Sequence, residues 1–263
     1  MGRVIAIVNQ KGGVGKTTTA VNLSAGLAMS GHTTLMLDMD AQCSATSGVG
    51  ISLEPGEPTT YEVLLGQSPA EQAIKKTMLP GLQVIGASQG LIGAEIELVN
   101  LENREVRLKE ALQSLRWRYD FIIMDCPPSL GLVTLNALTA ADALLIPVQC
   151  EYYALEGLAA VLKTIGLVRE ELNTSLEIEG LVLTMFDGRN GLARDVAKDI
   201  REHFGDQVFQ TLIPRNVKLS ESPGQGLPAL LYEPSSKGAV AYRELAAEVA
   251  VKHMKLKAAT NSV

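Results

Sequence analysis

Residues 9–18 read Asn-Gln-Lys-Gly-Gly-Val-Gly-Lys-Thr-Thr, and this segment decides the fold. The apolar run Val4–Val8 before it predicts a β-strand, and the pattern from about Thr17 to Ser30 predicts a helix. Glycines at a strand-to-helix turn let the backbone curl around an anion with its N–H groups inward, and the helix start adds a positive end. A turn without a ligand would not need the Gly-Lys-Thr ending, so the segment indicates a phosphate-binding loop.

The polar residues of this loop have separate expected roles. Lys16 is expected to reach the β- and γ-phosphates of a nucleotide, and the Thr17 hydroxyl is expected to ligate Mg²⁺. The segment Thr184–Asp187 lacks the lysine by which Ras-like GTPases read guanine, so ATP with Mg²⁺ is the expected cofactor pair. The expected nucleotide contacts within the loop are Gly12, Gly13, Val14, Gly15, Lys16, Thr17 and Thr18.

Beyond the loop, continuous apolar runs alternate with helical patterns along almost the whole chain. Strands that are apolar on both faces and alternate with helices are typical of a mostly parallel sheet with helices on both faces. We therefore expect an α/β fold, a P-loop NTPase with a twisted sheet, in one domain over residues 1–263. The stretch 44–80 is rich in Pro and Gly and is expected to be loop, and residues 252–263 are expected to form a flexible tail. The further strand candidates are 33–37, 82–85, 121–124, 143–148, 178–184 and 208–213.

Charge, cysteine spacing and hydropathy argue against a disulfide-stabilised protein, a CxxC metal protein and a membrane-spanning protein. The 263 residues carry a net charge of −6, but residues 188–263 alone carry 11 basic and 8 acidic side chains. Three widely spaced cysteines, Cys43, Cys126 and Cys150, form neither a disulfide framework nor a CxxC metal motif. No apolar run reaches the roughly 18 residues of a membrane span, and the first residues run straight into a strand. The sequence therefore predicts a cytoplasmic protein with a basic C-terminal third.

Three carboxylates follow predicted strands. Asp125 ends the buried run Phe121–Met124, and Asp38 and Asp40 follow the second strand. Ligands of parallel sheets bind beyond the carboxyl ends of the strands, which places these residues beside the phosphate-binding loop. A strand-end Asp can be a simple cap, but beside such a loop Asp125 is expected to hold Mg²⁺.

The loop resembles the deviant phosphate-binding loop of the ParA/MinD ATPases, because Gln10 replaces the first glycine and Lys11 follows it. The segments 125–131, 147–157 and 213–222 are also similar to Soj-type ParA. The resemblance covers roughly residues 3–250 and implies a homodimer that forms with ATP, in which Lys11 contacts the partner's nucleotide. It implies further that Asp40 polarises the attacking water, so the expected catalytic set is Lys11, Lys16 and Asp40.

The same resemblance assigns other positions. Asp38 is expected to support Mg²⁺ or the loop, and Pro214 and Asn216 are expected to line the adenine pocket. Arg189 and Lys218 are expected to contact nonspecific double-stranded DNA, which would associate the protein with the nucleoid. A ParB-like centromere-binding protein is the implied partner, and the implied function is chromosome or plasmid segregation.

Two alternatives and one departure stay open. A MinD-like membrane-associated positioning ATPase is the first alternative, although the tail 249–263 has no aromatic residue and is a poor membrane anchor. A metabolic or metal-cluster P-loop enzyme is the second. Ala41 and Cys43 stand where the ParA/Soj family commonly has Pro and Gly, which is expected to soften the loop that carries Asp40.

Overall fold

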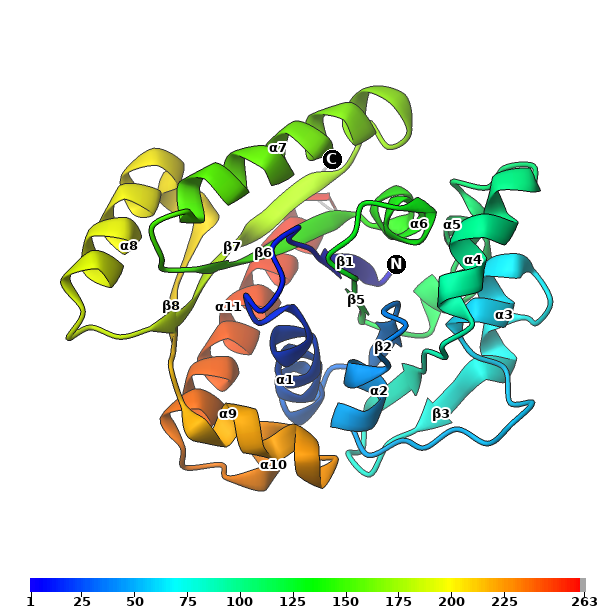
Figure 1. Ribbon diagram of the computed structural model, residues 1–263. Helices are drawn as coiled ribbons and strands as arrows, with labels where there is room; N and C mark the ends of the chain where they lie inside the picture. Colours follow the sequence, from blue (N-terminus) through cyan, green and yellow to red (C-terminus); the bar gives the residue numbers. More distant parts are fainter. Residues whose placement is uncertain (261–263) are drawn as a thin grey trace.

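In the computed structural model, which describes residues 1–260, eight strands form one sheet in the order β3-β4-β2-β5-β1-β6-β7-β8 (Figure 1). All neighbouring strands run parallel except β3 and β4, so the mostly parallel sheet is confirmed. The strands are β1 (Arg3–Ile7), β2 (Thr34–Asp38), β3 (Ile74–Lys76), β4 (Leu82–Ile85), β5 (Phe121–Asp125), β6 (Ala143–Gln149), β7 (Glu177–Phe186) and β8 (Val208–Pro214).

The helices connect these strands and differ from expectation in two places. The stretch 44–80, expected to be loop, contains two short helices and β3; Thr59 and Glu62 form a reciprocal capping box at the start of one of them. The helical pattern over residues 104–115 predicts one longer helix, whereas the structure forms only α5 (Arg107–Ala111) within it. The α-helices are α1 (Lys16–Met29), α2 (Ser44–Gly48), α3 (Thr60–Leu65), α4 (Leu91–Glu97), α5 (Arg107–Ala111), α6 (Leu132–Ala140), α7 (Ala154–Glu171), α8 (Gly191–Phe204), α9 (Val217–Glu221), α10 (Ala229–Tyr232) and α11 (Lys237–Thr260). The 3₁₀ turns are Ala70–Ala73, Leu98–Asn100, Leu115–Trp117, Gly205–Gln207 and Ser222–Gln225.

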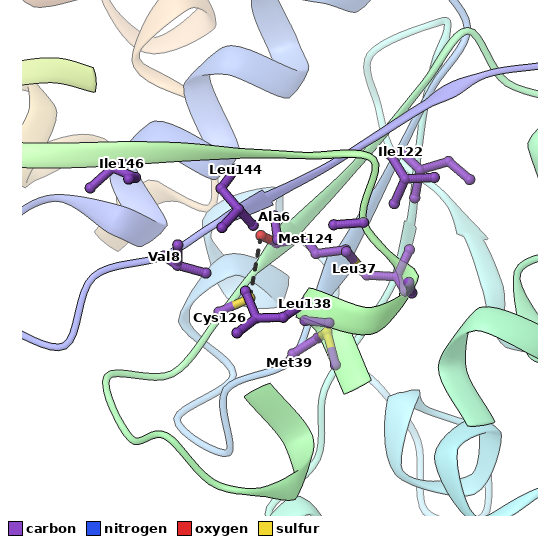
Figure 2. Close-up of a cluster of buried hydrophobic side chains, with 14 of the residues drawn as sticks. Ala6, Val8, Leu37, Met39, Ile122, Met124, Cys126, Leu138, Leu144 and Ile146 are labelled. Carbon is purple, nitrogen blue, oxygen red and sulfur yellow. Dashed lines mark hydrogen bonds between the residues drawn. The ribbon is translucent and has the colours of Figure 1, made fainter. Parts of the chain in front are cut away.

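Both faces of the sheet are covered by helices, as expected. Along β1, Val4 and Ala6 pack into one apolar cluster with α3 to α8, whereas Ile5 and Ile7 pack into a second cluster with α1, α10 and α11. This period-two alternation between two buried faces explains why the strands read as continuous apolar runs. Figure 2 shows the first cluster, in which Cys126 lies buried directly after the end of β5.

One edge of the sheet, here called the carboxyl edge, gathers the ends of β1, β2 and β5. Asp125 lies in register with Ile7 on one side and with Asp38 on the other. The loop before α1 therefore opens beside both strand-end carboxylates, as the parallel arrangement predicts.

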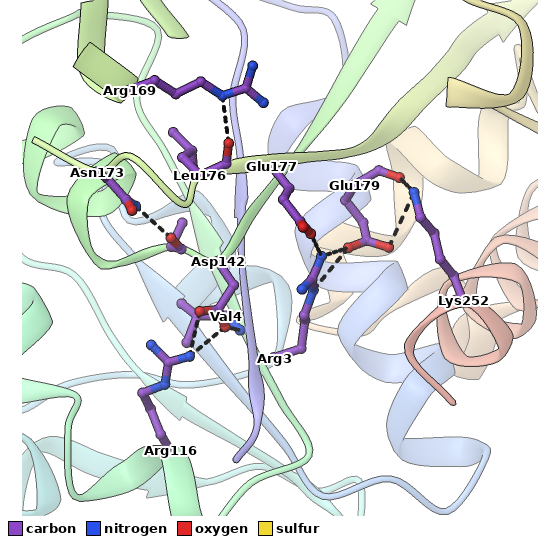
Figure 3. Close-up of polar contacts among 11 residues, drawn as sticks. Arg3, Val4, Arg116, Asp142, Arg169, Asn173, Leu176, Glu177, Glu179 and Lys252 are labelled. Carbon is purple, nitrogen blue, oxygen red and sulfur yellow. Dashed lines mark hydrogen bonds and ion pairs between the residues drawn. The ribbon is translucent and has the colours of Figure 1, made fainter. Parts of the chain in front are cut away.

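The opposite edge, the amino edge, is held by paired charges (Figure 3). Arg3 at the start of β1 bonds Glu177 at 2.7 Å and Glu179 at 3.1 Å. Arg116 lies 2.5 and 2.7 Å from the two oxygens of Asp142, which also accepts the N–H of Val4 at 2.8 Å. These contacts join the beginnings of β1, β6 and β7.

The C-terminal segment differs from the expected tail over residues 252–263. Helix α11 continues to Thr260, and residues 261–263 lie outside the described part of the chain. The segment after Val251 contains no Gly or Pro, and its three Lys, two Ala, one Met and one Leu favour a helix. Within it, the Lys252 ammonium donates to the backbone carbonyl of Glu179, so its first turn is tied to β7.

Candidate nucleotide-binding site

The loop between β1 and α1 has the backbone that an anion site requires. Gly13 and Gly15 have φ angles of 75° and 91°, in the left-handed region that side chains disfavour. A Cβ atom at Gly12 or Gly13 would meet nothing within 4 Å, so the space above the loop is open. No side chain of the described residues caps the start of α1, and its first turn holds no acidic residue. The N–H groups there are available to a phosphate.

Lys16, the first residue of α1, is a buried cation. Its side chain is only 7% exposed, and its Nζ donates to the backbone carbonyl of Lys11 at 3.1 Å. Burial lowers the pKa of Lys16, while Asp125, Cys126 and Asp40 oppose that shift. A charged amine in this position becomes more favourable when an anion enters the loop. This placement matches the expected contact with phosphates.

Lys11 lies on the outer side of the loop and does not point back toward Lys16. Its Nζ forms an ion pair with Glu151 at 3.1 Å, and both side chains are exposed. An exposed pair of this kind contributes little to stability and exchanges readily. Lys11 is therefore placed to leave Glu151 for another anion.

Asp125 is fully buried at the end of β5 and is incompletely paired. Among the described residues, neither carboxylate oxygen has a hydrogen-bond partner of ordinary geometry. Burial raises the pKa of Asp125 well above its usual range, Asp38 and Asp40 raise it further, and the Thr17 hydroxyl and Lys16 act in the opposite direction. A buried carboxylate without partners is costly, so it fits a position that a cation completes.

Asp38, by contrast, is already engaged in its own loop. Its oxygens accept from the Thr46 hydroxyl at 2.7 Å, the Thr46 N–H at 2.8 Å and the Asp40 N–H at 3.1 Å. Burial nevertheless raises the pKa of Asp38, with Asp40 adding to the effect. Of the two expected roles for Asp38, these contacts support the anchoring of the loop; the metal role stays a prediction.

Asp40 follows in the same loop and is half-buried. One of its oxygens accepts the Gln42 N–H at 2.9 Å, and its charge acts on Lys16 and Asp125. Cys43 adopts a φ of 55°, a left-handed conformation. This conformation favours glycine, so Cys43 occupies the position under strain. Burial, Asp38 and Asp40 raise the pKa of the Cys43 thiol, which opposes thiolate chemistry there.

A pocket of about 490 Å³ lies beside the loop, between α1, β7, β8 and α9. Pro214 and Asn216 both line it, together with Gly15 and Thr18 of the loop. The Asn216 side-chain oxygen accepts the Lys218 N–H at 2.9 Å and caps α9, so the amide NH₂ group is not part of that bond. The structure thus brings the residues expected at the adenine next to those expected at the phosphates.

The residues present fit a magnesium-nucleotide. Within residues 1–260 there is no group of three or more His, Cys, Asp or Glu side chains arranged to hold a metal by themselves. Mg²⁺ usually takes one or two carboxylates together with substrate phosphates and water. Thr17 and Asp125 would hold the ion here, and it would supply charge neutralisation at the phosphates.

Arg189 and Lys218 lie beyond the carboxyl ends of the last two strands of the sheet. Each follows an outer strand: Arg189 follows β7 and Lys218 follows β8, and the two strand ends are joined by the Arg215 N–H bond to Phe186. Arg189 is 91% exposed and bonds both oxygens of Asp187 at 2.9 and 2.7 Å. Lys218 pairs with Glu221 at 2.8 Å. Both cations are thus exposed, and both are held by a local carboxylate.

Some pocket residues were missed by sequence reasoning. Met185 lines the base pocket with a φ of 51°, a strained conformation for a side chain of this size. Its neighbour Thr184 donates to the Val14 carbonyl at 2.8 Å and holds the loop against β7. Tyr242 of α11 reaches the pocket and bonds Thr19 at 3.0 Å. The backbone strain at Met185 and the contact between Tyr242 and Thr19 depend on the folded structure, so neither can be predicted from one sequence.

Comparisons with known proteins agree with this geometry. A family model described as "AAA domain" matches residues 2–178. The chain is 54% identical to the sporulation initiation inhibitor protein Soj of Bacillus subtilis, over 95% of this chain and 99% of the relative. It is 53% identical to the chromosome partitioning protein ParA of Myxococcus xanthus, over 95% and 88%. A Mycobacterium smegmatis structure, titled cobyrinic acid a,c-diamide synthase with bound ADP and magnesium, matches with a TM-score of 0.83, 37% identity and coverage of 97% and 96%.

The fold and the site define a P-loop nucleotide-binding protein of the α/β class. Within that class, the chain belongs to the ParA/Soj family of chromosome-partitioning ATPases. Among residues 1–260, no helix is both long and apolar enough to cross a membrane.

Proposed function

We propose that this protein is a Mg²⁺-dependent ATPase that dimerises around ATP, binds DNA without sequence preference and segregates chromosomes or plasmids with a ParB-like partner. The observation that carries the proposal is the pair of buried, incompletely compensated charges, Lys16 and Asp125, beside an open glycine loop and a base-sized pocket. The bound ADP and magnesium named for the M. smegmatis relative support the same cofactor pair.

In the proposed reaction the chain positions the nucleotide and screens its charge. Lys16 and the first N–H groups of α1 hold the phosphates, and Thr17 and Asp125 hold Mg²⁺. Asp40, whose charge acts on Lys16 and Asp125, orients the water that attacks the terminal phosphate. Pro214 and Asn216 contact the base from the pocket wall.

Lys11 completes the site of a second copy in this proposal. Its exposed pair with Glu151 is exchanged for the partner's phosphates when two ATP-bound copies meet. Large apolar side chains are exposed in the same region: Tyr152 at 75%, Tyr153 at 63% and Leu130 at 46%. Exposed tyrosines next to the loop are typical of a protein–protein interface.

Light scattering tests the dimer. The Asp40→Ala variant with ATP is expected to run as a dimer, and the same variant with ADP as a monomer. Adding Lys11→Ala to it should restore the monomer with ATP, whereas adding Lys109→Ala, at an exposed lysine of α5, should not. A dimer that persists without Lys11 would refute its role across the interface.

The proposed DNA contacts are Arg189 and Lys218. No base-reading element is assigned to them, so the contacts go to phosphates, and duplication of the patch in the dimer couples DNA binding to ATP. Each cation is held by a carboxylate on the same surface, Asp187 or Glu221, which DNA phosphates must displace. Loss of either cation should reduce the salt-dependence slope by about one unit per charge removed.

A salt titration on unrelated duplexes tests this surface. Arg189→Ala and Lys218→Ala are expected to weaken ATP-dependent binding equally on all sequences, with Lys109→Ala as the control. Asp187→Asn should strengthen binding several-fold because it releases Arg189. Unchanged affinity in both alanine variants, with dimerisation intact, would move the DNA surface elsewhere.

The alternatives make different predictions in the same assays. A MinD-like positioning ATPase would sediment with anionic vesicles in ATP and not with DNA. A metabolic enzyme would consume a small molecule, and neither DNA nor a ParB-like protein would raise its ATPase rate. Higher identity to Soj and ParA than to the M. smegmatis synthase favours the partitioning role.

A further inference from the structure

Helix α6 begins without a cap from its own sequence. Gly131 stands at the N-cap and provides no side chain to accept the first N–H groups. The acceptor comes from α4: Glu95 takes the Leu132 N–H on Oε2 at 2.7 Å and the Val133 N–H on Oε1 at 3.3 Å. A carboxylate at this point accepts hydrogen bonds from N–H groups that have no partner within the helix. Its negative charge also interacts favourably with the positive end of the helix dipole, so it acts as a local cap would.

Glu95 also fills the space that a side chain at Gly131 would need. A Cβ atom built on Gly131 would lie 2.3 Å from each oxygen of Glu95. The backbone of Gly131 has a φ of −101° and a ψ of −170°, which any residue can adopt. A side chain at Gly131 would therefore have to displace the Glu95 carboxylate, whereas the backbone would accept it, so Glu95 and Gly131 form a matched pair.

The start of α6 closes the loop that follows Asp125. That loop runs from Cys126 to Leu130, and the Thr134 hydroxyl of α6 donates back to its Ser129 carbonyl at 2.6 Å. Both ends of the loop are then fixed, one by β5 and the other by the Glu95 cap. Displacement of α6 at this point would be passed to the residues next to Asp125.

The other end of α4 is tied to the loop of Asp38. The segment before α4 is held by the Ala87 N–H bond to the Thr46 hydroxyl at 2.9 Å, and that hydroxyl donates to Asp38 at 2.7 Å. The Thr60 N–H donates to the Gly86 carbonyl at 2.9 Å. A chain of contacts therefore runs from Asp38 through Thr46 and α4 to Glu95 and the start of α6.

We propose that Glu95 is a positioning residue for the nucleotide site: it holds the loop after Asp125 in a fixed relation to the loop of Asp38 and Asp40. The proposal rests on the proposed ATPase function for its catalytic consequence. Its structural part, the cap across elements, stands on the hydrogen bonds and the Gly131 contact alone.

The first experiment compares Glu95→Ala with Glu97→Ala on the same helix, where Glu97 is exposed and bonds Tyr61. In Glu95→Ala, hydrogen exchange at the Leu132 and Val133 amides should become about tenfold faster, the size of a lost helix cap. The kcat of ATP hydrolysis should fall several-fold while KM changes less than twofold. Glu95→Gln, which keeps one acceptor, should recover part of both effects, and Glu97→Ala should show neither.

The second experiment uses the matched pair. Gly131→Ser in the wild type should speed exchange at Leu132 and Val133, because its Cβ displaces the Glu95 carboxylate. In the Glu95→Ala background the same substitution should slow exchange at Val133, the second amide of α6, because the serine side chain accepts that N–H in the vacated space. The effect of Gly131→Ser on amide exchange at Val133 thus has opposite signs in the two backgrounds. Only a role of Glu95 as a helix cap predicts this, and the measurement needs no nucleotide.

Two outcomes would overturn the cap on which the proposal rests. One is unchanged exchange at Leu132 and Val133 in Glu95→Ala; the other is a Gly131→Ser effect of the same sign in both backgrounds. A tenfold exchange effect with kcat unchanged would overturn the positioning role. Absence of ATPase activity in the wild type would instead count against the proposed function and would leave the exchange result to decide the cap.

Discussion

The charged side chains at the amino edge of the sheet have hydrogen-bonded partners, whereas Lys16 and Asp125, buried at the carboxyl edge, form no ion pair within residues 1–260. At the amino edge, Arg116 pairs with Asp142, Arg3 pairs with Glu179, and the Asn173 amide donates to three carbonyls that end α6, at 2.8 to 3.3 Å (Figure 3). At the carboxyl edge, Lys16 and Asp125 are only 7% and 0% exposed, yet neither has a side-chain partner of hydrogen-bonding geometry among the described residues.

This difference separates charges that stabilise the fold from charges that await a ligand. Paired charges in a partly buried position hold strand ends together, and removing one partner leaves the other uncompensated. Burial lowers the pKa of Lys16 and raises the pKa of Asp125, so each is pushed toward its neutral form in the free protein. Phosphate would stabilise the charged form of Lys16, and Mg²⁺ would stabilise the charged form of Asp125. The free energy that the two buried charges cost the empty protein is therefore recovered when the ligand binds, which increases its affinity.

The largest expected effect is at the carboxyl edge. Lys16→Ala should weaken nucleotide binding at least about 100-fold, because it removes the buried cation facing the phosphates. The folded protein without nucleotide should lose little stability, since Lys16 forms no ion pair with a carboxylate within residues 1–260 and its burial disfavours the charge. Titration calorimetry with ATP measures the first effect and chemical denaturation the second; wild-type affinity in the variant would show the loop assignment to be wrong.

The next effect is at the amino edge. Asp142→Ala should lower the free energy of unfolding by about 2 kcal/mol, because it removes the partner of Arg116 and the acceptor of the Val4 N–H. Nucleotide affinity should stay within twofold. Glu177→Gln is the matched control, because Glu177 is an exposed partner of Arg3 and should change stability little. If Asp142→Ala and Glu177→Gln lowered the free energy of unfolding equally, the partly buried ion pair would contribute no more to stability than the exposed one, and this prediction would be wrong.

A smaller effect is the pH dependence of the carboxyl edge. Burial raises the pKa values of Asp38 and Asp125, so the folded chain binds their protons more tightly than the unfolded chain. Their penalty on stability is therefore present above the raised pKa values and is relieved as pH falls through them, by at most about 1.4 kcal/mol per pH unit and group. Mg²⁺-nucleotide affinity should fall over the same range, because protonation competes with the metal. Calorimetric titrations at several pH values should find proton release on binding; a pH-independent affinity would contradict this.

The smallest effect concerns the strained turn after Asp40. Cys43→Gly should raise the free energy of unfolding by about 0.5 kcal/mol, because relief of the left-handed conformation exceeds the added entropy of glycine in the unfolded chain. Cys43→Ala keeps the strain and is the control. Denaturant midpoints measure both, and an equal gain in the two variants would point to the thiol and not to the backbone.

The sequence was informative where chemistry follows directly from local pattern. The strand–loop–helix around Gly12 to Thr17, the parallel sheet and the strand-end position of Asp125 all followed from apolar runs and glycine placement. Adjacent carboxyl ends in a parallel sheet made the meeting of Asp38 and Asp125 predictable as well.

What could not be predicted depends on contacts between distant segments. The partnership of Lys11 with Glu151, the cap that Glu95 gives to α6 and the three donors on Asp38 all require the folded arrangement. Proline and glycine in residues 44–80 concealed α2 and α3, because tertiary packing there outweighs weak local propensity. The carboxylates that hold Arg189 and Lys218 lie two and three residues away, but their geometry was not readable from spacing.

Thermal unfolding of wild type and Asp125→Asn, each with and without Mg²⁺-ADP, tests the central claim most directly. Without ligand, the variant should melt above the wild type, because it replaces a buried, incompletely paired carboxylate with a neutral amide. With Mg²⁺-ADP, the order should reverse, because only the wild type can complete its charge with the metal. A variant that melts below the wild type without ligand, or that gains as much from Mg²⁺-ADP, would contradict the account.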